Sequence, residues 1–252
     1  MEAEILSRIS QKWAEQRFDR MVKGLSDLDD SALRQLRRRV RAWGLRMDTA
    51  ERVIRDRLTL PREGAIVTAP PPATDIAERH RICAARLSKS DKVKPPSDTV
   101  LAEGLTLFHD CSQSEIILRQ VRNSGRSFAA PYGLQIEVFE FRGTFLSLKL
   151  QVPFGASMTH YDIVTLRTHI TMESKGPIFA RLNIGKGAHI ESVIREVPEG
   201  NAFAAAEFDF FFMDTKLDKT QEIWIDLSFD HVSMNRITIH DLVLFKSRRA
   251  DI

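Results

Sequence analysis

From Leu101 to the C-terminus, apolar and polar residues alternate with a period of two, which is typical of strands with one buried face. In residues 134–138, for example, three apolar residues alternate with Gln135 and Glu137. The alternation predicts strands over 105–109, 116–121, 134–138, 145–152, 164–172, 178–184, 190–197, 206–212, 223–229 and 237–245. Glycine- and proline-containing turns separate them. Such a series predicts an all-β domain, a two-sheet antiparallel β-sandwich of the jelly-roll type.

Residues 2–57 show helical spacing instead. Apolar residues recur every three or four positions up to Gly24, a natural helix end. Ser26 and Asp29 resemble a capping box that starts a second helix with a heptad seam. The seam consists of Leu33, Leu36, Val40, Trp43, Met47, Ala50 and Ile54. Because short connections favour antiparallel neighbours, we expect a helical hairpin; a homodimer through the seam is the alternative.

A third kind of sequence lies between Thr59 and Val100, where six of the ten prolines occur and neither period is sustained. We expect a proline-rich linker or draped loop there, with a brief helical turn within 75–87. The predicted organisation is therefore a helical hairpin over residues 1–58, a linker over 59–100 and the β-sandwich over 101–252.

The composition, with 43% hydrophobic and 28% charged residues, is that of a globular protein. No stretch approaches the roughly 18 apolar residues of a membrane-spanning helix. The N-terminus is acidic and lacks the basic start and apolar stretch of a secretory signal, so we expect a cytoplasmic protein of bacterial type. In that compartment both cysteines, Cys83 and Cys111, are expected to be thiols.

The net charge of +3 is unevenly distributed. Residues 1–100 contain 21 Lys and Arg against 15 Asp and Glu, whereas residues 101–252 contain 16 against 19. Much of this excess of positive charge lies on the second predicted helix. An anionic surface, of nucleic acid or membrane, could bind there to Arg34, Arg37, Arg38 and Arg41. Because the arginines spread around every face except the seam, we favour solvated arginines, and nucleic acid is not an expected partner.

The search for catalytic motifs is negative, and we expect no enzyme, metal or cofactor. No phosphate-binding loop, nucleophile elbow, His-Glu-x-x-His or Cys-x-x-Cys motif is present. Residues 185–187 (Gly-Lys-Gly) predict a hairpin turn. His109 precedes Asp110 and Cys111, but since neighbours in a strand point to opposite faces we do not expect a Cys–His pair. His240 with Asp241 gives the one suggestion of a metal ligand set.

Several strand positions predicted to face solvent carry aromatic or hydrogen-bonding side chains that a sheet does not need in order to be soluble. If the apolar residues of 223–229 face the core, Trp224 and Asp226 face outward, and an outward Trp suggests a ligand or partner. The same alternation adds Phe179, Arg181, Asn183, Arg167 and His169 to the candidate ligand-binding residues. Aromatic faces beside hydrogen-bonding groups suit sugar rings. Alternatively, the N-terminal helices or the proline-rich segment cover these aromatics.

Five short motifs carry a resemblance over the whole chain: residues 57–61 (RLTLP), 107–111 (LFHDC), 145–148 (FLSL), 179–184 (FARLNI) and 224–227 (WIDL). Through them the chain resembles an uncharacterised alphaproteobacterial family of unknown function, which implies no activity. The run 179–244 is similar in rhythm to galactose-binding-like carbohydrate-binding jelly rolls, which implies a sugar ligand.

The function expected from these observations is a non-catalytic binding module, for a carbohydrate or glycan, with an N-terminal docking or oligomerisation element. The alternative is a scaffold or adaptor that binds a protein partner or an anionic surface through the arginine-rich helix. Salt distinguishes the two functions, because the affinity for phosphate groups of an anionic surface falls steeply as the salt concentration rises, whereas stacking on a sugar barely responds.

Overall fold

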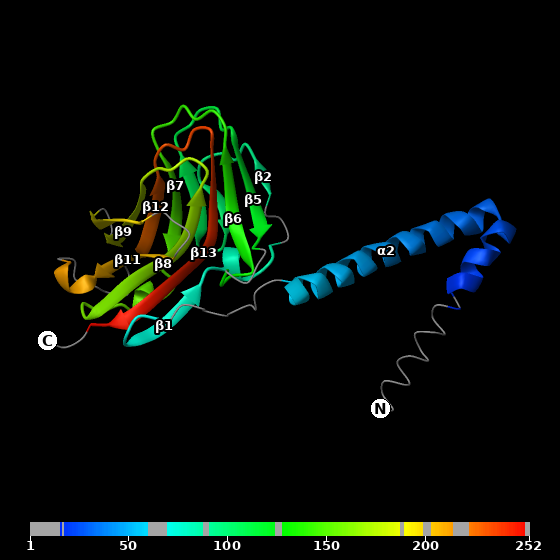
Figure 1. Cartoon of the computed structure of the whole chain (residues 1–252), viewed down its shortest axis with the longest axis horizontal. Coiled ribbons are helices and arrows are strands. Elements are labelled where there is room, and N and C mark those ends of the chain that lie inside the picture. Colours follow the sequence, from blue (N-terminus) through cyan, green and yellow to red (C-terminus); the bar gives the residue numbers. More distant parts are fainter. Residues whose placement is uncertain are drawn as a thin grey trace. The chain divides into compact units, whose positions relative to one another are not determined.

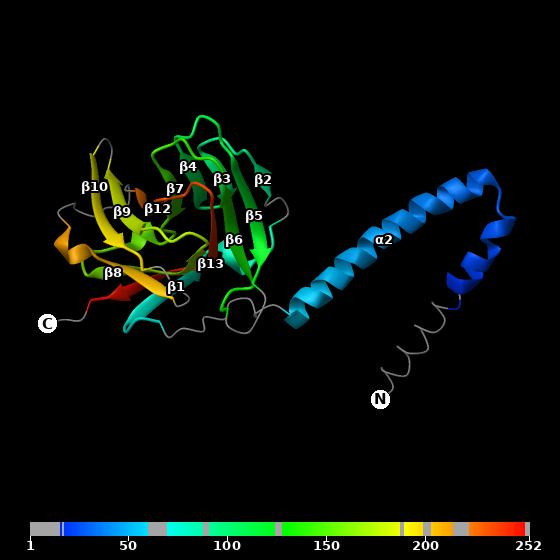
Figure 2. The same cartoon turned by 45° about the horizontal axis from the view of Figure 1, so that its top comes forward.

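In the computed structural model the described residues are 16, 18–59, 70–87, 91–123, 128–186, 189–198, 203–213 and 222–249. By its internal contacts the chain divides into two compact units, Met1–Leu58 and Thr59–Ile252. The second unit is a β-sandwich in which two antiparallel sheets pack face to face (Figures 1 and 2). The all-β sandwich expected from the period-two alternation is thus confirmed.

Each sheet has a defined strand order. The seven-stranded sheet has the order β11 (Ala204–Asp209), β8 (Asp162–Met172), β13 (Asn235–Arg248), β6 (Tyr132–Val138), β5 (Ile116–Arg122) and β2 (Lys92–Val93), with β1 (Thr74–Arg79) paired to β13. The six-stranded sheet has the order β10 (His189–Glu196), β9 (Ile178–Lys186), β12 (Glu222–Phe229), β7 (Leu146–Gln151), β4 (Leu105–His109) and β3 (Thr99–Ala102). In the described part of the sandwich, three short helical turns connect strands: α3 (Arg81–Ala84), η2 (Gly155–Ser157) and η3 (Phe210–Phe212).

The core lies between the two sheets and follows the alternation of the strands. On β12, Ile223, Ile225, Leu227 and Phe229 are all buried in it. Burying side chains of this size contributes roughly 1.5–3 kcal/mol each, so the inward face fixes which side chains of β12 point outward. Both cysteines are buried free thiols, as expected.

The linker predicted over residues 59–100 is wrong for part of its length. Residues 74–79 form β1, which pairs with the C-terminal half of β13, and the two strands lie side by side in Figure 1. The helical turn α3 follows and buries Ile82 and Cys83 in the sandwich. Because β1 is short and contributes one partly buried apolar residue, Ile76, its sequence shows no alternation to detect. The boundary expected near residue 100 therefore lies before residue 74.

In the first unit, residues 18–23 are helical and continue into the 3-10 turn η1 (Gly24–Asp27), and the helix α2 (Asp30–Thr59) follows. The expected capping box is wrong in its first residue: Asp29, not Ser26, caps α2 by accepting hydrogen bonds from the Ala32 N–H (2.8 Å) and the Ser31 hydroxyl (3.0 Å). These hydrogen bonds lower the pKa of Asp29. Most of the first predicted helix, residues 1–15 and 17, lies outside the described residues.

The apolar seam of α2 is not buried where the structure describes it. Trp43 is 48% exposed and Met47 is 72% exposed, and Val40 is exposed beside them. Burial of the seam, by the predicted hairpin or by a homodimer, therefore stays a prediction. No helix among the described residues is long and apolar enough to cross a membrane.

Candidate functional site

The outer face of the six-stranded sheet carries five of the seven predicted ligand-binding residues. Trp224 on β12 lies opposite Asn183 on β9 and Gln151 on β7. The next outward residue, Asp226, lies opposite Arg181 and Lys149 in the same two strands. Phe179 lies one further step along β9, opposite Ser228. Since cross-strand partners on one face lie within about 5.5 Å, these residues form one continuous surface, which we call the Trp224 face.

The indole of Trp224 lies across the sheet over Gly185. A Cβ added at Gly185 would lie 3.0 Å from Cζ3 of the indole, so the missing side chain makes room for the ring. The ammonium of Lys149 lies over the same ring, 4.5 Å from its centroid, and also pairs with Glu222 at 2.8 Å. Trp224 remains partly exposed in this arrangement.

Asp226 and Asn183 form a fixed polar pair beside the indole. Asn183 is buried and its Nδ2 donates to Oδ2 of Asp226 at 2.9 Å and to the backbone oxygen of Arg181 at 3.1 Å. Burial raises the pKa of Asp226, while hydrogen bonds from Asn183 and Trp224 and the charges of Arg181 and Lys149 oppose that rise. The amide and the carboxyl are therefore held in one orientation next to the aromatic ring.

The other two predicted ligand-binding residues do not belong to this face. Arg167 and His169 lie on β8, and β8 is part of the seven-stranded sheet. Alternation along β8 turns both side chains away from the core, which places them on the opposite outer surface of the sandwich from Trp224. Five of the seven candidate residues therefore share one surface, and Arg167 and His169 lie on the other sheet. The sequence shows which face of a strand is outward but not to which sheet the strand belongs.

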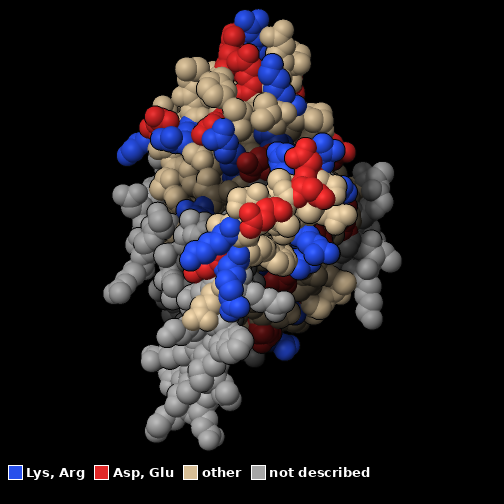
Figure 3. Space-filling model, turned by 90° about the vertical axis from the view of Figure 1, so that its right-hand side faces the viewer, with Lys and Arg blue, Asp and Glu red and all other residues tan. Residues whose placement is uncertain are grey.

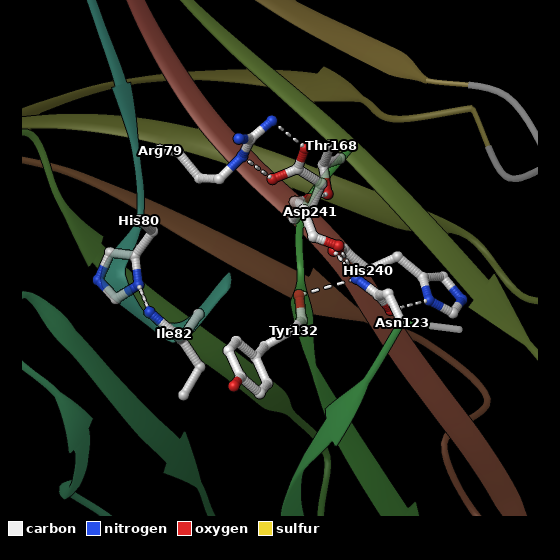
Figure 4. Close-up of polar contacts among 9 residues, drawn as sticks. Arg79, His80, Ile82, Asn123, Tyr132, Thr168, His240 and Asp241 are labelled. Carbon is white, nitrogen blue, oxygen red and sulfur yellow. Dashed lines mark hydrogen bonds and ion pairs between the residues drawn. The ribbon is translucent and has the colours of Figure 1, made fainter. Parts of the chain in front are cut away.

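A polar network on the seven-stranded sheet is centred on a buried ion pair (Figure 4). Arg79 of β1 donates to Asp241 of β13 from Nε at 2.9 Å and from Nη2 at 3.0 Å, and the two side chains are 4% and 2% exposed. Burial raises the pKa of Asp241, and Arg79 opposes that rise. Sequence reasoning missed this pair because Arg79 lies in the segment predicted as linker.

The hydrogen bonds of His240 define its tautomer (Figure 4). Nδ2 of Asn123 faces three backbone oxygens, those of Ala130, Tyr132 and His240, so Oδ1 of Asn123 is the acceptor for Nδ1 of His240 at 2.9 Å. Nε2 of the neutral ring then accepts from the Thr171 hydroxyl at 3.0 Å. Burial and the neighbouring His169 lower the pKa of His240 to about 4.

His169 is held among aromatic rings. It stacks on Phe128, with 5.5 Å between ring centroids, and lies 4.9 Å from His240 and 5.4 Å from Phe203. Burial lowers its pKa, and Asp241 opposes that effect. The pair His240–Asp241 does not form the metal site that the sequence suggested: within the described residues no three His, Cys, Asp or Glu side chains converge to hold an ion.

The arginines of α2 are exposed, as expected for solvated side chains. Arg34, Arg37, Arg38 and Arg41 are all on the surface of the helix. On the face drawn in Figure 3, Lys and Arg are interspersed with Asp and Glu and do not gather into one basic patch.

His109 and Cys111 are arranged differently from the sequence expectation. Both are buried and line the same cleft at one end of the sandwich, beside the turn after β2 and the loop after β4. β4 ends at His109, so the strand alternation that the expectation assumed does not extend to Cys111. The Cys111 thiol donates to the backbone oxygen of Gln113 at 3.0 Å.

Comparison with known structures finds a distant resemblance to β-sandwich proteins, among them carbohydrate-binding modules. A family 11 carbohydrate-binding module from Clostridium thermocellum matches at 11% identity and a TM-score of 0.36, over 64% of this chain and 98% of that one. Bacteriophage CBA120 tailspike protein 4 matches at 9% identity and a TM-score of 0.39, over 56% of this chain. A C. thermocellum xylanase 10B fragment matches at 12% identity and a TM-score of 0.36, over 60% of this chain.

These likenesses concern the fold alone. The matched regions span 19% of the tailspike chain and 27% of the xylanase chain. No curated protein matches the sequence. The chain belongs to a family of unknown function (DUF6478), whose model matches residues 1–252.

Proposed function

We propose that this protein is a non-catalytic binding module that holds a carbohydrate on the Trp224 face. The observation that supports this most directly is the placement of the indole over Gly185, partly exposed and next to the oriented Asn183–Asp226 pair. An aromatic ring stacks on the C–H face of a sugar, while the amide and the carboxyl supply directional hydrogen bonds to its hydroxyls. Arg181 and Gln151, both exposed on adjacent strands, add further polar groups.

Lys149 over the indole is compatible with ligand binding. Its ion pair with Glu222 is largely exposed, and such pairs contribute only about 0–1 kcal/mol. A sugar that approaches the ring therefore displaces the ammonium at little cost, or accepts a hydrogen bond from it. The buried Asn183 behind Asp226 keeps the carboxyl in place while Lys149 moves.

The direct test is binding of the full chain to a glycan panel before and after Trp224→Ala. We expect the substitution to weaken binding at least about tenfold, equivalent to about 1.4 kcal/mol, because the stacking surface is lost. Trp224→Phe should retain part of the affinity. Trp43→Phe, on α2, is the matched control and should change nothing.

Two results would contradict the proposal. Binding unaffected by Trp224→Ala would place the ligand elsewhere. A loss of roughly 3–5 kcal/mol of unfolding free energy in that variant, as for buried Trp truncations, would show that the indole serves packing. Urea unfolding of the same preparations separates the two cases, since we expect a loss of about 1–2 kcal/mol at a partly exposed ring.

A second candidate function rests on α2, whose exposed seam is flanked by exposed arginines. An apolar stripe of this kind suits a partner helix or a second copy of the chain. Sedimentation measures self-association directly. Binding to acidic vesicles or duplex DNA, if present, should fall steeply between low and high salt, whereas sugar binding at Trp224 should barely change.

A further inference from the structure

The cleft lined by His109 and Cys111 has unused hydrogen-bonding capacity. It has a volume of about 800 Å³ and lies between residues 94–97, after β2, and residues 109–115, at the end of β4 and in the loop that follows. Volumes of this size are typical of small-ligand sites. The cleft is separate from the Trp224 face, whose residues do not line it.

His109 lines this cleft and has a ring nitrogen without a hydrogen-bond partner among the described residues. It is 5% exposed, and its Nε2 lies 3.1 Å from the backbone oxygen of Pro95. Because a carbonyl only accepts, Nε2 carries the proton, and in the neutral ring Nδ1 is an acceptor. Nδ1 is buried, and the part of the chain that the structure describes offers it no hydrogen-bond partner. The backbone N–H of His109 donates to the Ser97 hydroxyl oxygen at 3.0 Å. This hydrogen bond joins the end of β4 to the turn after β2.

Ser114 supplies a second unused group in the same cleft. Its Oγ is buried and has no hydrogen-bond partner among the described residues. Two acidic residues line the cleft. Asp110 accepts hydrogen bonds from the backbone N–H and the hydroxyl of Thr144 and from the N–H of Phe145, and Glu115 accepts one from the backbone N–H of Glu140. A buried polar group without a partner costs about 1–3 kcal/mol, so an occupant that satisfies both groups is favoured.

We propose that this cleft binds a neutral, polyhydroxylated ligand. One ligand hydroxyl donates to Nδ1 of His109 and accepts from the Ser114 hydroxyl, so that both buried groups gain a partner. An anion is disfavoured by the lone pair of Nδ1, and an apolar ligand would leave both groups unsatisfied. The chemistry fits a free monosaccharide or the end of a glycan chain.

The test uses the full chain and the Cys111 thiol as a reporter. Cys83 is fully buried, and burial raises the pKa of its thiol, whereas Cys111 is 7% exposed and lines the cleft, so alkylation by iodoacetamide is followed at Cys111. We measure the alkylation rate by mass spectrometry with a monosaccharide panel in one arm and an oligosaccharide panel in the other. At least one sugar should slow alkylation of Cys111 at least fivefold at saturation. Protection by monosaccharides identifies a free sugar as the ligand of the cleft, and protection by oligosaccharides alone identifies the end of a glycan chain as the ligand.

Ser114→Ala should weaken the protecting sugar about tenfold, whereas Ser174→Ala, at an exposed serine, should not. Trp224→Ala should leave the protection unchanged, which separates this site from the Trp224 face. The ¹⁵N shift of His109 Nδ1 gives an independent measurement and should move when the sugar is added. No protection in either arm, equal affinity in Ser114→Ala, or an unmoved Nδ1 signal would overturn the proposal and leave water as the occupant.

Discussion

At Gly133 the fold requires a residue without a side chain. A Cβ there would lie 2.7 Å from the backbone oxygen of Ile239 and 3.2 Å from Oδ1 of Asn123. The contact with backbone cannot relax by a side-chain movement. The glycine thus allows β6, Asn123 and the irregular part of β13 near His240 to approach closely. Gly185 likewise leaves space where a Cβ would lie, and the indole of Trp224 occupies that space.

At the same scale, His240 predicts a pH dependence of stability. Its pKa falls from 6.5 to about 4 on folding, so between these values the unfolded chain binds the proton and the folded chain does not. Stability is therefore complete above about pH 6.5 and decreases as the pH falls toward 4. We expect His240 to account for about 1–2 kcal/mol of this loss, with allowance for its partial exposure.

Urea unfolding at about pH 7 and pH 4.5 measures the effect. His240→Gln should reduce the difference between the two pH values, and His189→Gln, an exposed histidine of β10, should not. Asp226 and Asp241 act in the opposite direction, because their raised pKa values let the folded state bind protons first. An unchanged pH difference in His240→Gln would contradict the assignment.

At the scale of elements, the attachment of β1 to β13 depends on backbone pairing and on the Arg79–Asp241 pair. We expect Arg79→Met to lower the unfolding free energy by about 3–5 kcal/mol, because it leaves a buried carboxylate without its partner. The double variant Arg79→Met/Asp241→Leu should recover much of that loss. Arg119→Met, in a largely exposed pair with Glu137, is the control and should cost less than about 1 kcal/mol. Urea unfolding measures these changes. If Arg79→Met and Arg119→Met lost equal unfolding free energy, burial of the Arg79–Asp241 pair would contribute nothing to stability.

At the scale of the whole molecule, the two units predict where the chain can be divided. A fragment over residues 70–252 contains every described strand and should unfold cooperatively, as followed by circular dichroism. A fragment over 101–252 lacks β1, α3, β2 and the first two residues of β3 (Thr99–Ala102), and with them the buried Ile82 and the Arg79–Asp241 pair. We expect the shorter fragment to be unfolded or at least about 3 kcal/mol less stable. Equal melting curves would support the boundary predicted near residue 100.

The sequence alone determined the class of fold and the outward side chains of each strand. The alternation over 223–229 places Trp224 and Asp226 outside because the apolar residues between them must be buried, and this needs no knowledge of neighbouring strands. The same reasoning identified Arg181 and Asn183 on β9. The sandwich itself follows from a series of such strands, each with one face to bury.

Only the tertiary structure decided which strands are neighbours, and therefore which outward residues share a surface. Strand order depends on hydrogen bonds between segments far apart in the chain, which a local period does not encode. For that reason the sequence could not show that Arg167 and His169 lie on the other sheet from Trp224, and β1 was predicted as linker although it pairs with β13. The cleft at His109 required the turn after β2, with Pro95, to fold against the end of β4, and no spacing in the sequence brings these segments together.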